Sequence, residues 1–223
     1  MLEILDNVDA SLLLFLNGAN NEFFDELFWL ITGKFAWIPM ICVLLFCTFR
    51  KDWKTGVLVV VGIALTITLC DQVSSGIIKD AVCRLRPTRD PEIGSLVHVV
   101  NGYRGGQYGF VSSHAANSFG VAMFLAMMFR NRAFSWIIML WAAVLSYSRI
   151  YLGVHYPGDI VCGGLLGVAL GAVVYCIYIR VKKLYFFASA NSVDGRDAMW
   201  LSFATIGNVL LLVATATIIY AMK

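Results

Sequence analysis

Long apolar stretches recur along this chain and constrain its fold more than any other feature. Hydrophobic residues make up 60% of its 223 positions, and the mean hydropathy is +0.78. Soluble domains contain about 45–50% apolar residues, so an excess of this size spread over the whole length indicates a membrane protein. The sequence therefore predicts an all-α fold, a polytopic membrane helix bundle.

Six segments are apolar enough to be transmembrane helices. They are Phe35–Phe49, Gly56–Ile78, Ser113–Phe129, Ala133–Tyr151, Gly158–Ile179 and Trp200–Tyr220. A span needs about 20 apolar residues, and the first segment is shorter than that. Either it begins earlier, near Leu27, with a kink at Gly33-Lys34, or the bilayer thins around it.

Residues 1–34 mix acidic residues with Leu and Phe. The patterns of Leu2–Asn17 and Phe23–Ile31 are typical of amphipathic helices that lie at a membrane surface. We therefore expect two parts: an amphipathic interfacial segment over residues 1–34 and a six-helix transmembrane domain over residues 35–223.

The cationic residues of the connections predict an orientation. With six spans, nine of the 17 Lys and Arg residues fall on one side of the membrane and eight on the other. Three of those eight, Lys79, Arg86 and Arg149, belong to the polar clusters described below, and without them the balance is nine to five. The side with nine is predicted to be cytoplasmic. Both termini and the clusters then lie on the extracytoplasmic face of the cytoplasmic (inner) membrane.

Other global features exclude several classes of protein. The net charge of +3 is modest, so we expect no nucleic acid partner. Met1–Asp9 carries acids instead of a basic region, so no cleavable signal is expected and the first span would direct insertion. Five of the six cysteines lie in or beside apolar stretches, which favours packing roles. Their spacings match neither a disulfide framework nor a metal site.

Most chemically capable side chains fall in three short clusters separated by apolar sequence. The clusters are Lys79 with Arg86-Pro87, then Ser112-Ser113-His114, and then Ser148-Arg149 with His155 and Asp159. They supply three cations, two histidines and one carboxylate, which can bind a phosphate and attack it without a metal. Six spans would bring all three clusters to one membrane face, and ionisable residues that can pair at such a boundary indicate a functional site.

The first cluster lies where the second predicted span leaves the membrane. Lysine presents a compact charge, and arginine presents a planar fork that matches phosphate oxygens. The alternative is that Lys79 and Arg86 snorkel to the interface or contact lipid headgroups.

The second cluster opens the third predicted span. Ser112 or Ser113 can cap that helix, and the free N–H groups and dipole of its first turn favour an anion. His114 would lie close to whatever binds there. A capping serine beside an interfacial histidine is the alternative interpretation.

The third cluster is the most specific. His155 precedes Pro157, which suits the first position of a helix, and Asp159 then falls in the first turn. A carboxylate bonded to one ring nitrogen fixes the histidine tautomer and leaves the other nitrogen as a nucleophile or base. Ordinary helix capping is the alternative.

These residues resemble the three signature motifs of the type 2 phosphatidic acid phosphatase superfamily, which includes membrane lipid phosphate phosphatases and soluble vanadium haloperoxidases. The matching patterns are Lys79-x6-Arg86-Pro87, Ser112-x-His114 and Ser148-Arg149-x5-His155-x3-Asp159. The first and third motifs match fully. In the second, the family usually has Pro-Ser-Gly-His, whereas this chain has Val111-Ser112-Ser113-His114.

The resemblance implies a role for each residue. His155 would attack phosphorus and form a phosphohistidine, Asp159 would orient His155, and His114 would protonate the leaving oxygen and then activate water. The expected phosphate-binding set is Lys79, Arg86, Ser112, Ser113 and Arg149. No further cluster of Asp, Glu and His is left to hold a metal, so we expect no metal and no other cofactor.

The favoured function is an integral-membrane phosphatase that hydrolyses a phosphoester or phosphoanhydride of an envelope lipid. The candidate substrates are undecaprenyl diphosphate, a lipid A phosphate, phosphatidylglycerol phosphate and phosphatidic acid, and the remaining partners are membrane lipids. A lipid-to-lipid phosphotransferase would use the same residues. A non-catalytic phospholipid-binding transporter would use only the cations, but it has no need for the His155–Asp159 pair and more often shows repeated halves.

Overall fold

A computed structural model describes residues 2–33, 35–50, 52–185 and 195–223. Across these residues the chain is helical apart from its loops, and the only β pairing is an isolated bridge between Leu85 and Tyr108. The all-α prediction is therefore confirmed for the described chain. The α-helices are α1 (Leu2–Gly18), α2 (Glu22–Ile31), α3 (Ile38–Phe49), α4 (Trp53–Asp71), α5 (Lys79–Val82), α6 (Ser113–Phe129), α7 (Arg132–Tyr151), α8 (Pro157–Tyr185) and α9 (Gly195–Ala221).

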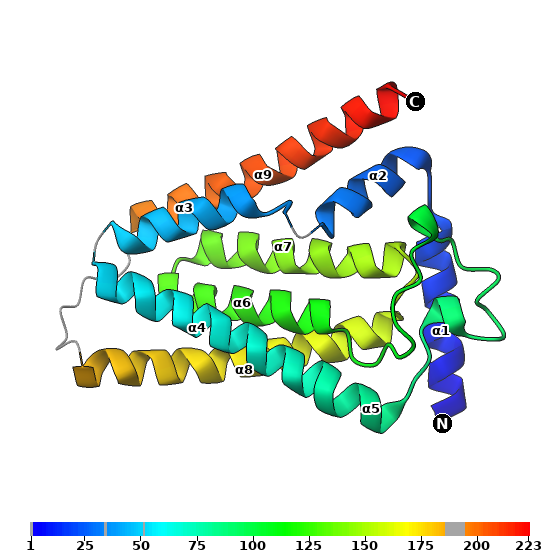
Figure 1. Cartoon of the computed structure of the whole chain (residues 1–223), viewed down its shortest axis with the longest axis horizontal. Coiled ribbons are helices and arrows are strands. Elements are labelled where there is room, and N and C mark those ends of the chain that lie inside the picture. Colours follow the sequence, from blue (N-terminus) through cyan, green and yellow to red (C-terminus); the bar gives the residue numbers. More distant parts are fainter. Residues whose placement is uncertain (1, 34, 51, 186–194) are drawn as a thin grey trace.

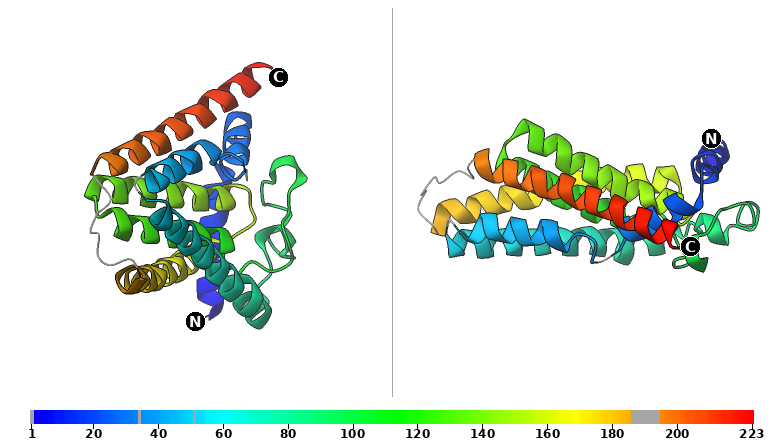
Figure 2. Two further views of the ribbon diagram at one scale, coloured as in Figure 1. Left: turned by 60° about the vertical axis from the view of Figure 1, so that its left-hand side comes forward. Right: turned by 90° about the horizontal axis from the view of Figure 1, so that it is seen from above.

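Six of these helices, α3, α4, α6, α7, α8 and α9, run side by side along the long axis of the molecule (Figure 1). Helix α1 lies across one end of this bundle, next to the long connection between α5 and α6 (Figures 1 and 2). One end of the bundle therefore carries the N-terminal helix and the longest described loop.

Four helical segments are long and apolar enough to cross a membrane, namely Trp53–Val82, Arg132–Tyr151, Pro157–Leu184 and Gly195–Ala221. The helices α3 and α6 are apolar but shorter, with 12 and 17 residues. At about 1.5 Å per residue, α3 is only about 18 Å long, against about 30 Å for the hydrocarbon core of a bilayer. The chain is thus a multi-pass membrane protein, and the count of six spans stays a prediction.

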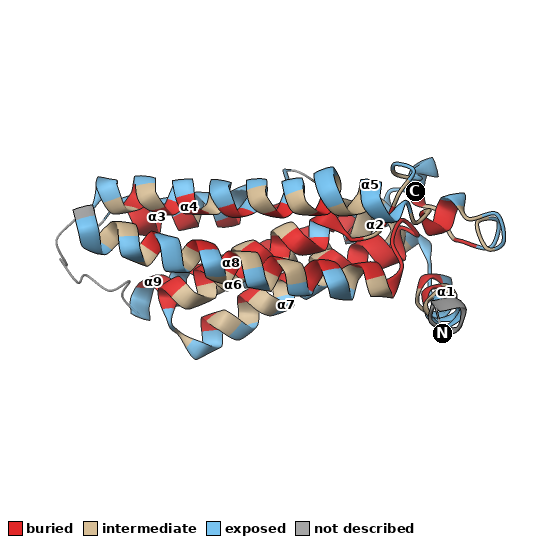
Figure 3. Ribbon diagram, turned by 90° about the horizontal axis from the view of Figure 1, so that it is seen from below, coloured by how far each residue is buried: buried red, intermediate tan, exposed pale blue. Residues whose placement is uncertain are grey.

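The outer surface of the bundle is rich in large apolar side chains. Leu140, Leu165 and Leu211 are 65%, 66% and 55% exposed. Exposed positions recur along the outward faces of the helices (Figure 3). Extended apolar surfaces are rare on soluble monomers, and lipid is the solvent that suits them. The cysteine prediction is only partly right, because Cys47 and Cys70 are buried whereas Cys42, Cys162 and Cys176 are exposed.

Helix α6 forms the centre of the bundle and approaches α8 very closely. A Cβ atom on Gly167 would overlap the carbonyl oxygen of Ala116, and one on Gly171 would overlap the carbonyl oxygen of Gly120. Small residues spaced by four positions allow such close contact between membrane helices. The glycines of α8 therefore serve to pack this helix against α6.

This contact continues to the end of the bundle that carries the polar clusters. A Cβ atom on Gly163 would lie 2.5 Å from the carbonyl oxygen of Ser112. The backbone N–H of Ser112 donates to the carbonyl oxygen of Asp159 at 3.0 Å. The glycines of α8 therefore bring the second and third clusters together.

We predict that Gly171→Ala lowers the stability of the folded protein by about 1–3 kcal/mol, because its added methyl group overpacks the α6–α8 contact. The measurement is the thermal unfolding midpoint of the purified protein in detergent. Gly207→Ala in α9 is the matched control, because nothing lies within 4 Å of a Cβ atom at that position. Its midpoint should stay level or rise, since alanine favours helix over glycine by about 1 kcal/mol. Equal midpoints for the two variants would contradict the packing role.

Candidate active site

All three polar clusters lie at the same end of the bundle, where α5 ends, α6 begins, and α7 turns into α8 (Figure 1). The side chains of Ser112 and Asp159 are fully buried, and those of His155 and Arg149 are nearly so. Charged groups are rarely buried without partners, so their contacts define what this end of the bundle can do.

A π-helical segment, Gln72–Ile78, continues α4 directly ahead of Lys79. Such segments occur frequently at functional sites. The hydroxyls of Ser74 and Ser75 in this segment lie 2.9 and 2.7 Å from Ser113 Oγ. The Lys79 ammonium donates to the same oxygen at 2.7 Å. Ser113 therefore supports Lys79, and its direct role in phosphate binding stays a prediction.

Arg86 is positioned by a short pairing of two loop segments. Its backbone N–H donates to the carbonyl oxygen of Gln107 at 3.1 Å, next to the bridge between Leu85 and Tyr108. The Arg86 Nη1 atom donates to the carbonyl oxygen of Val154 at 3.0 Å. Its Nε atom is buried and has no hydrogen-bond partner in the described part of the chain.

A tight turn between α7 and α8 places Arg149 close to His155. The N–H of Val154 donates to the carbonyl of Arg149, and the N–H of Gly153 donates to that of Ile150. These two bonds form a Schellman motif. The motif requires one residue in the left-handed conformation, which glycine adopts without strain. Gly153 has a φ of +69°.

Arg149 is held by contacts from outside its own helix. Its Nη1 atom donates to Thr32 Oγ1 at 2.7 Å, and its Nη2 atom donates to the Tyr103 hydroxyl at 3.1 Å. The Nε atom of Arg149 is buried and, over the residues that the structure describes, unpartnered. Both buried arginines thus retain an N–H donor for an additional acceptor such as a phosphate oxygen.

Asp159 holds His155, as its position in the first turn of α8 predicts. The Asp159 Oδ2 atom lies 3.2 Å from His155 Nδ1 and accepts the backbone N–H of Tyr156 at 3.1 Å. A carboxylate here accepts the Nδ1 proton, which leaves Nε2 with its lone pair. Arg86 Nη1 lies 3.0 Å from Nε2, on the side opposite the carboxylate.

Burial lowers the pKa of His155 well below its usual value of 6.5, and the positive charges of Arg86, Arg149 and Lys79 lower it further. The imidazole is therefore neutral at pH 7. Only a neutral ring has a lone pair for attack on phosphorus, so the electrostatics of the site favour the nucleophilic form.

The second histidine has a different environment. His114 is exposed at the start of α6 and lies in the field of the same cations that act on His155. An exposed imidazole beside a buried cationic pocket can exchange protons with water and with a bound ligand. The two histidines therefore differ in burial and in partners, as two distinct roles would require.

Sequence reasoning missed the central role of Arg84. Its Nη1 atom donates to Asp159 Oδ1 at 3.0 Å and lies 2.9 Å from Asp9 Oδ2. Its Nη2 atom lies 3.0 Å from Asp6 Oδ1, and its guanidinium stacks 4.0 Å from the centre of the Tyr156 ring. Arg84 thereby links α1 to the carboxylate that holds His155. The i, i+3 spacing of Asp6 and Asp9 was the available signal, since it places both acids on one face of a helix.

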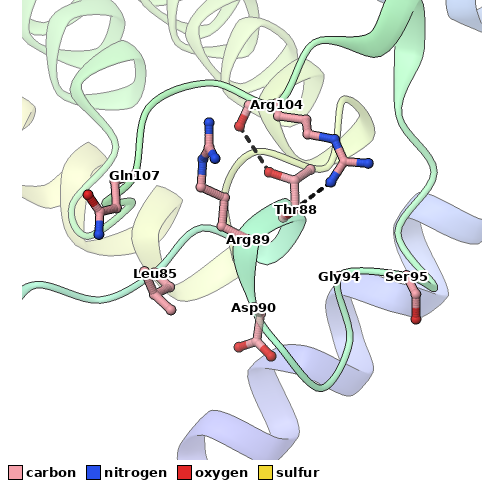
Figure 4. Close-up of a pocket in the computed structure, with 8 residues that line it drawn as sticks. All are labelled: Leu85, Thr88, Arg89, Asp90, Gly94, Ser95, Arg104 and Gln107. Carbon is pink, nitrogen blue, oxygen red and sulfur yellow. Dashed lines mark hydrogen bonds between the residues drawn. The ribbon is translucent and has the colours of Figure 1, made fainter.

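A basic pocket of about 780 Å³ opens in the loop beside these residues, lined by Arg89 and Arg104 among others (Figure 4). The Arg89 side chain donates to the carbonyl oxygens of Gly105 and Gly106 at 3.4 and 3.3 Å. A Cβ atom on Gly105 would lie 3.1 Å from Arg86 Nη1. The loop segment at Gly105 and Gly106 therefore has the buried Arg86 on one side and the exposed Arg89 on the other.

Across the residues with described positions, no group of three or more His, Cys, Asp or Glu side chains could hold a metal ion. The predicted site residues instead form a set of cations around one histidine–aspartate pair. Independence from a metal stays a prediction that an activity assay has to test.

We predict that His155 stays neutral in the free protein at pH 6. Nuclear magnetic resonance of ¹⁵N-histidine-labelled protein should show a ring protonated at Nδ1 only, with its titration midpoint below 6.5. Since the pKa is lower in the folded state than in the unfolded state, His155 should also destabilise the fold as the pH falls below 6.5. The chain has three histidines, and His155→Gln assigns the resonance. A midpoint at or above 6.5 would contradict the electrostatic account.

Comparison with known proteins finds several relatives of this chain. The lipid A 4′-phosphatase of Bacteroides thetaiotaomicron is 42% identical over 225 residues, which cover 100% of this chain and 99% of that protein. The lipid A 4′-phosphatase of Porphyromonas gingivalis is 37% identical over 84% of this chain and 80% of its own length. The undecaprenyl-diphosphatase of Sulfolobus acidocaldarius is 30% identical over 60% of this chain and 59% of its own.

Two crystal structures share the fold. LpxE of Aquifex aeolicus has a TM-score of 0.55 at 23% identity, covering 74% of this chain and 92% of its own. The PAP2-type phosphatidylglycerolphosphate phosphatase of Bacillus subtilis has a TM-score of 0.59 at 23% identity, covering 81% and 89%. The family model described as "PAP2 superfamily" matches residues 55–183, which confirms the resemblance read from the motifs. The chain therefore belongs to the PAP2 superfamily and is a multi-pass membrane phosphatase.

Proposed function

We propose that this phosphatase removes a phosphate from a lipid A-type lipid by way of a phosphohistidine on His155. The observation that carries the proposal is the alignment of Asp159, His155 and Arg86. Asp159 lies at one ring nitrogen, and Arg86 lies 3.0 Å from the other, where a phosphoryl group has to sit. The cation that would bind the phosphate is thus already beside the nitrogen that would attack it.

In the first step, His155 Nε2 bonds to phosphorus while the bond from phosphorus to the lipid oxygen breaks. Negative charge spreads over the three non-bridging oxygens as this happens. Lys79, Arg86 and Arg149 would take up that charge, and the N–H groups at the start of α6 would add to them. His114 would take up a proton once the bound phosphate offsets the neighbouring cations, and it would then give that proton to the departing lipid oxygen.

In the second step, the neutral His114 removes a proton from a water molecule, which attacks the phosphohistidine. The P–N bond breaks, inorganic phosphate leaves, and His155 returns to its neutral form. Asp159 stays a carboxylate throughout and stabilises the positive charge on the phosphorylated ring. Transfer to a second lipid in place of water would use the same first step.

The lipid A assignment is supported by two relatives, of which one matches this chain over its full length. The undecaprenyl-diphosphatase relative covers much less of the chain. The pocket lined by Arg89 and Arg104 adds a structural argument, since it gives room and positive charge for a headgroup that extends beyond the reacting phosphate (Figure 4).

We also propose six spans, with the active site on the extracytoplasmic face of the inner membrane. Helix α1 lies across the same end of the bundle as the site, which suits an interfacial helix (Figure 2). The opposite end contains the α3–α4 and α6–α7 connections, with Arg50, Lys54, Arg130 and Arg132. Positive charge in short connections favours the cytoplasmic side.

His155→Ala should reduce phosphate release at least about 1,000-fold, because the nucleophile is lost while binding groups remain. The assay uses purified protein in detergent with lipid A, undecaprenyl diphosphate, phosphatidylglycerol phosphate and phosphatidic acid, and lipid A should be the best substrate. Wild-type protein should form an acid-labile ³²P-phosphoenzyme that His155→Ala lacks. Chelators should leave the activity of the wild-type protein unchanged, and vanadate should inhibit it.

His98→Ala is the matched histidine control, because His98 contacts Asp25 and lies outside the phosphate site. Turnover that survives in His155→Ala at more than a few per cent would overturn the nucleophile assignment. A requirement for added Mg²⁺ would overturn the metal-free mechanism. Phosphate release without any acceptor lipid separates the hydrolase from the phosphotransferase.

The topology predicts that green fluorescent protein inserted after Arg130 stays in the cytoplasm and is fluorescent. The same reporter fused to the C-terminus, after Lys223, would be exported through the Sec pathway and should be dark. Fluorescence of the exported fusion is lost because that reporter folds poorly outside the cytoplasm. Whole-cell fluorescence normalised to protein amount is the measurement. A dark fusion at Arg130 with a fluorescent one at Lys223 would show that the orientation is the opposite of the predicted one.

A further inference from the structure

An open cavity of about 190 Å³ lies between α4, α6 and α7, starting at His114. Its walls are formed by Ile67 of α4, Asn117 and Val121 of α6, and Trp141 and Leu145 of α7. Val121 lies seven residues after His114, so the open cavity extends about 10 Å along α6, away from the proposed phosphate site.

The two helices that form most of the cavity lead directly to catalytic groups. On α6, His114, Asn117 and Val121 follow one another at helical spacing on one face. On α7, Trp141 and Leu145 continue by the same spacing of four to Arg149. The cavity therefore extends from His114 of the proposed site to an apolar region further along α6 and α7.

Two of the polar side chains in this lining lack hydrogen-bond partners among the described residues. The Trp141 Nε1 atom and the Asn117 Oδ1 atom are both buried and have no hydrogen-bond partner in the described chain. Buried polar groups in proteins nearly always have partners, so an unpartnered pair in one cavity needs an explanation. By contrast, the Ser118 hydroxyl in the same wall is paired with the carbonyl oxygen of Ala115 at 3.2 Å.

We propose that this cavity binds the acyl portion of the substrate, and that Trp141 and Asn117 hydrogen-bond to the ester or amide group that joins its chain to the headgroup. Trp141 donates to the carbonyl oxygen. Asn117, whose amide can present either a donor or an acceptor, pairs with the same linkage. The first methylene groups of the chain then lie against Ile67, Val121 and Leu145.

This inference rests on the proposed function, and it adds a substrate class to it. An acylated lipid phosphate has a carbonyl group only a few bonds from the phosphate oxygen. A polyprenyl diphosphate has no such group anywhere in its chain, so binding it would leave both polar side chains unpaired. A site that hydrogen-bonds a substrate group rejects analogues that lack it. The cavity therefore selects acylated lipids over polyprenyl diphosphates.

The decisive comparison uses two substrates that differ only in the carbonyl group. They are a diacyl phosphatidic acid and its dialkyl ether analogue with chains of the same length. Wild-type kcat/KM should be about three- to tenfold higher for the ester, as expected for one or two hydrogen bonds. Trp141→Phe keeps an aromatic ring and removes the N–H, so it should lower kcat/KM for the ester and leave the ether value unchanged.

Asn117→Leu is the second variant and should reduce the same ester preference. Trp136→Phe is the matched control, because Trp136 is on the same helix with 78% of its side chain exposed. Trp141 also makes an edge contact with Trp37, with ring centres 5.5 Å apart. A purely structural role for Trp141 would lower both kcat/KM values equally, and that result would overturn the proposal.

A binding measurement in His155→Ala separates this inference from the proposed function, because it needs no turnover. The ester lipid should raise the thermal unfolding midpoint of His155→Ala more than the ether lipid does. Adding Trp141→Phe should remove the difference. Equal stabilisation by both lipids would overturn the acyl-binding site whatever the enzyme hydrolyses. A clear difference without any phosphate release would keep the binding site and overturn the proposed function.

Discussion

The close contact between α6 and α8 supports the arrangement of the whole site. Glycines at 163, 167 and 171 let the α8 backbone approach the α6 backbone. At the end of this contact the N–H of Ser112 donates to the carbonyl of Asp159, which joins the capped start of one helix to the first turn of the other. Two helix N-termini, each favourable for negative charge, therefore lie side by side at the proposed phosphate site.

The N-terminal helix has more than a surface role. The carboxylates of Asp6 and Asp9 lie beside Arg84, which donates to Asp159. Asp9 also accepts the backbone N–H of Gly158 at 2.7 Å, at the first turn of α8. A buried carboxylate between a histidine and an arginine has its orientation determined by both partners. Helix α1 thus helps to determine the direction in which His155 presents its lone pair.

Polarity along the site follows the polarity of a lipid phosphate. Exposed arginines surround the loop pocket, buried cations surround His155, two unpartnered polar side chains lie one or two turns deeper, and apolar residues complete the cavity. Such an order suits a molecule with a charged headgroup, a polar linkage and an alkyl chain. The proposed substrate class and the proposed acyl site therefore both match this change from charged to polar to apolar residues.

The sequence by itself determined the helical class, the polar clusters and the His155–Asp159 pair, because these depend on local spacing. A carboxylate in the first turn of α8 reaches a histidine that lies just ahead of the same helix through local backbone geometry alone. Only the tertiary structure decided the contacts of Arg84 with α1, of Arg149 with Thr32 and Tyr103, and of Ser113 with Lys79. The members of each pair are far apart in the sequence, so these side chains come into contact only when the helices pack together.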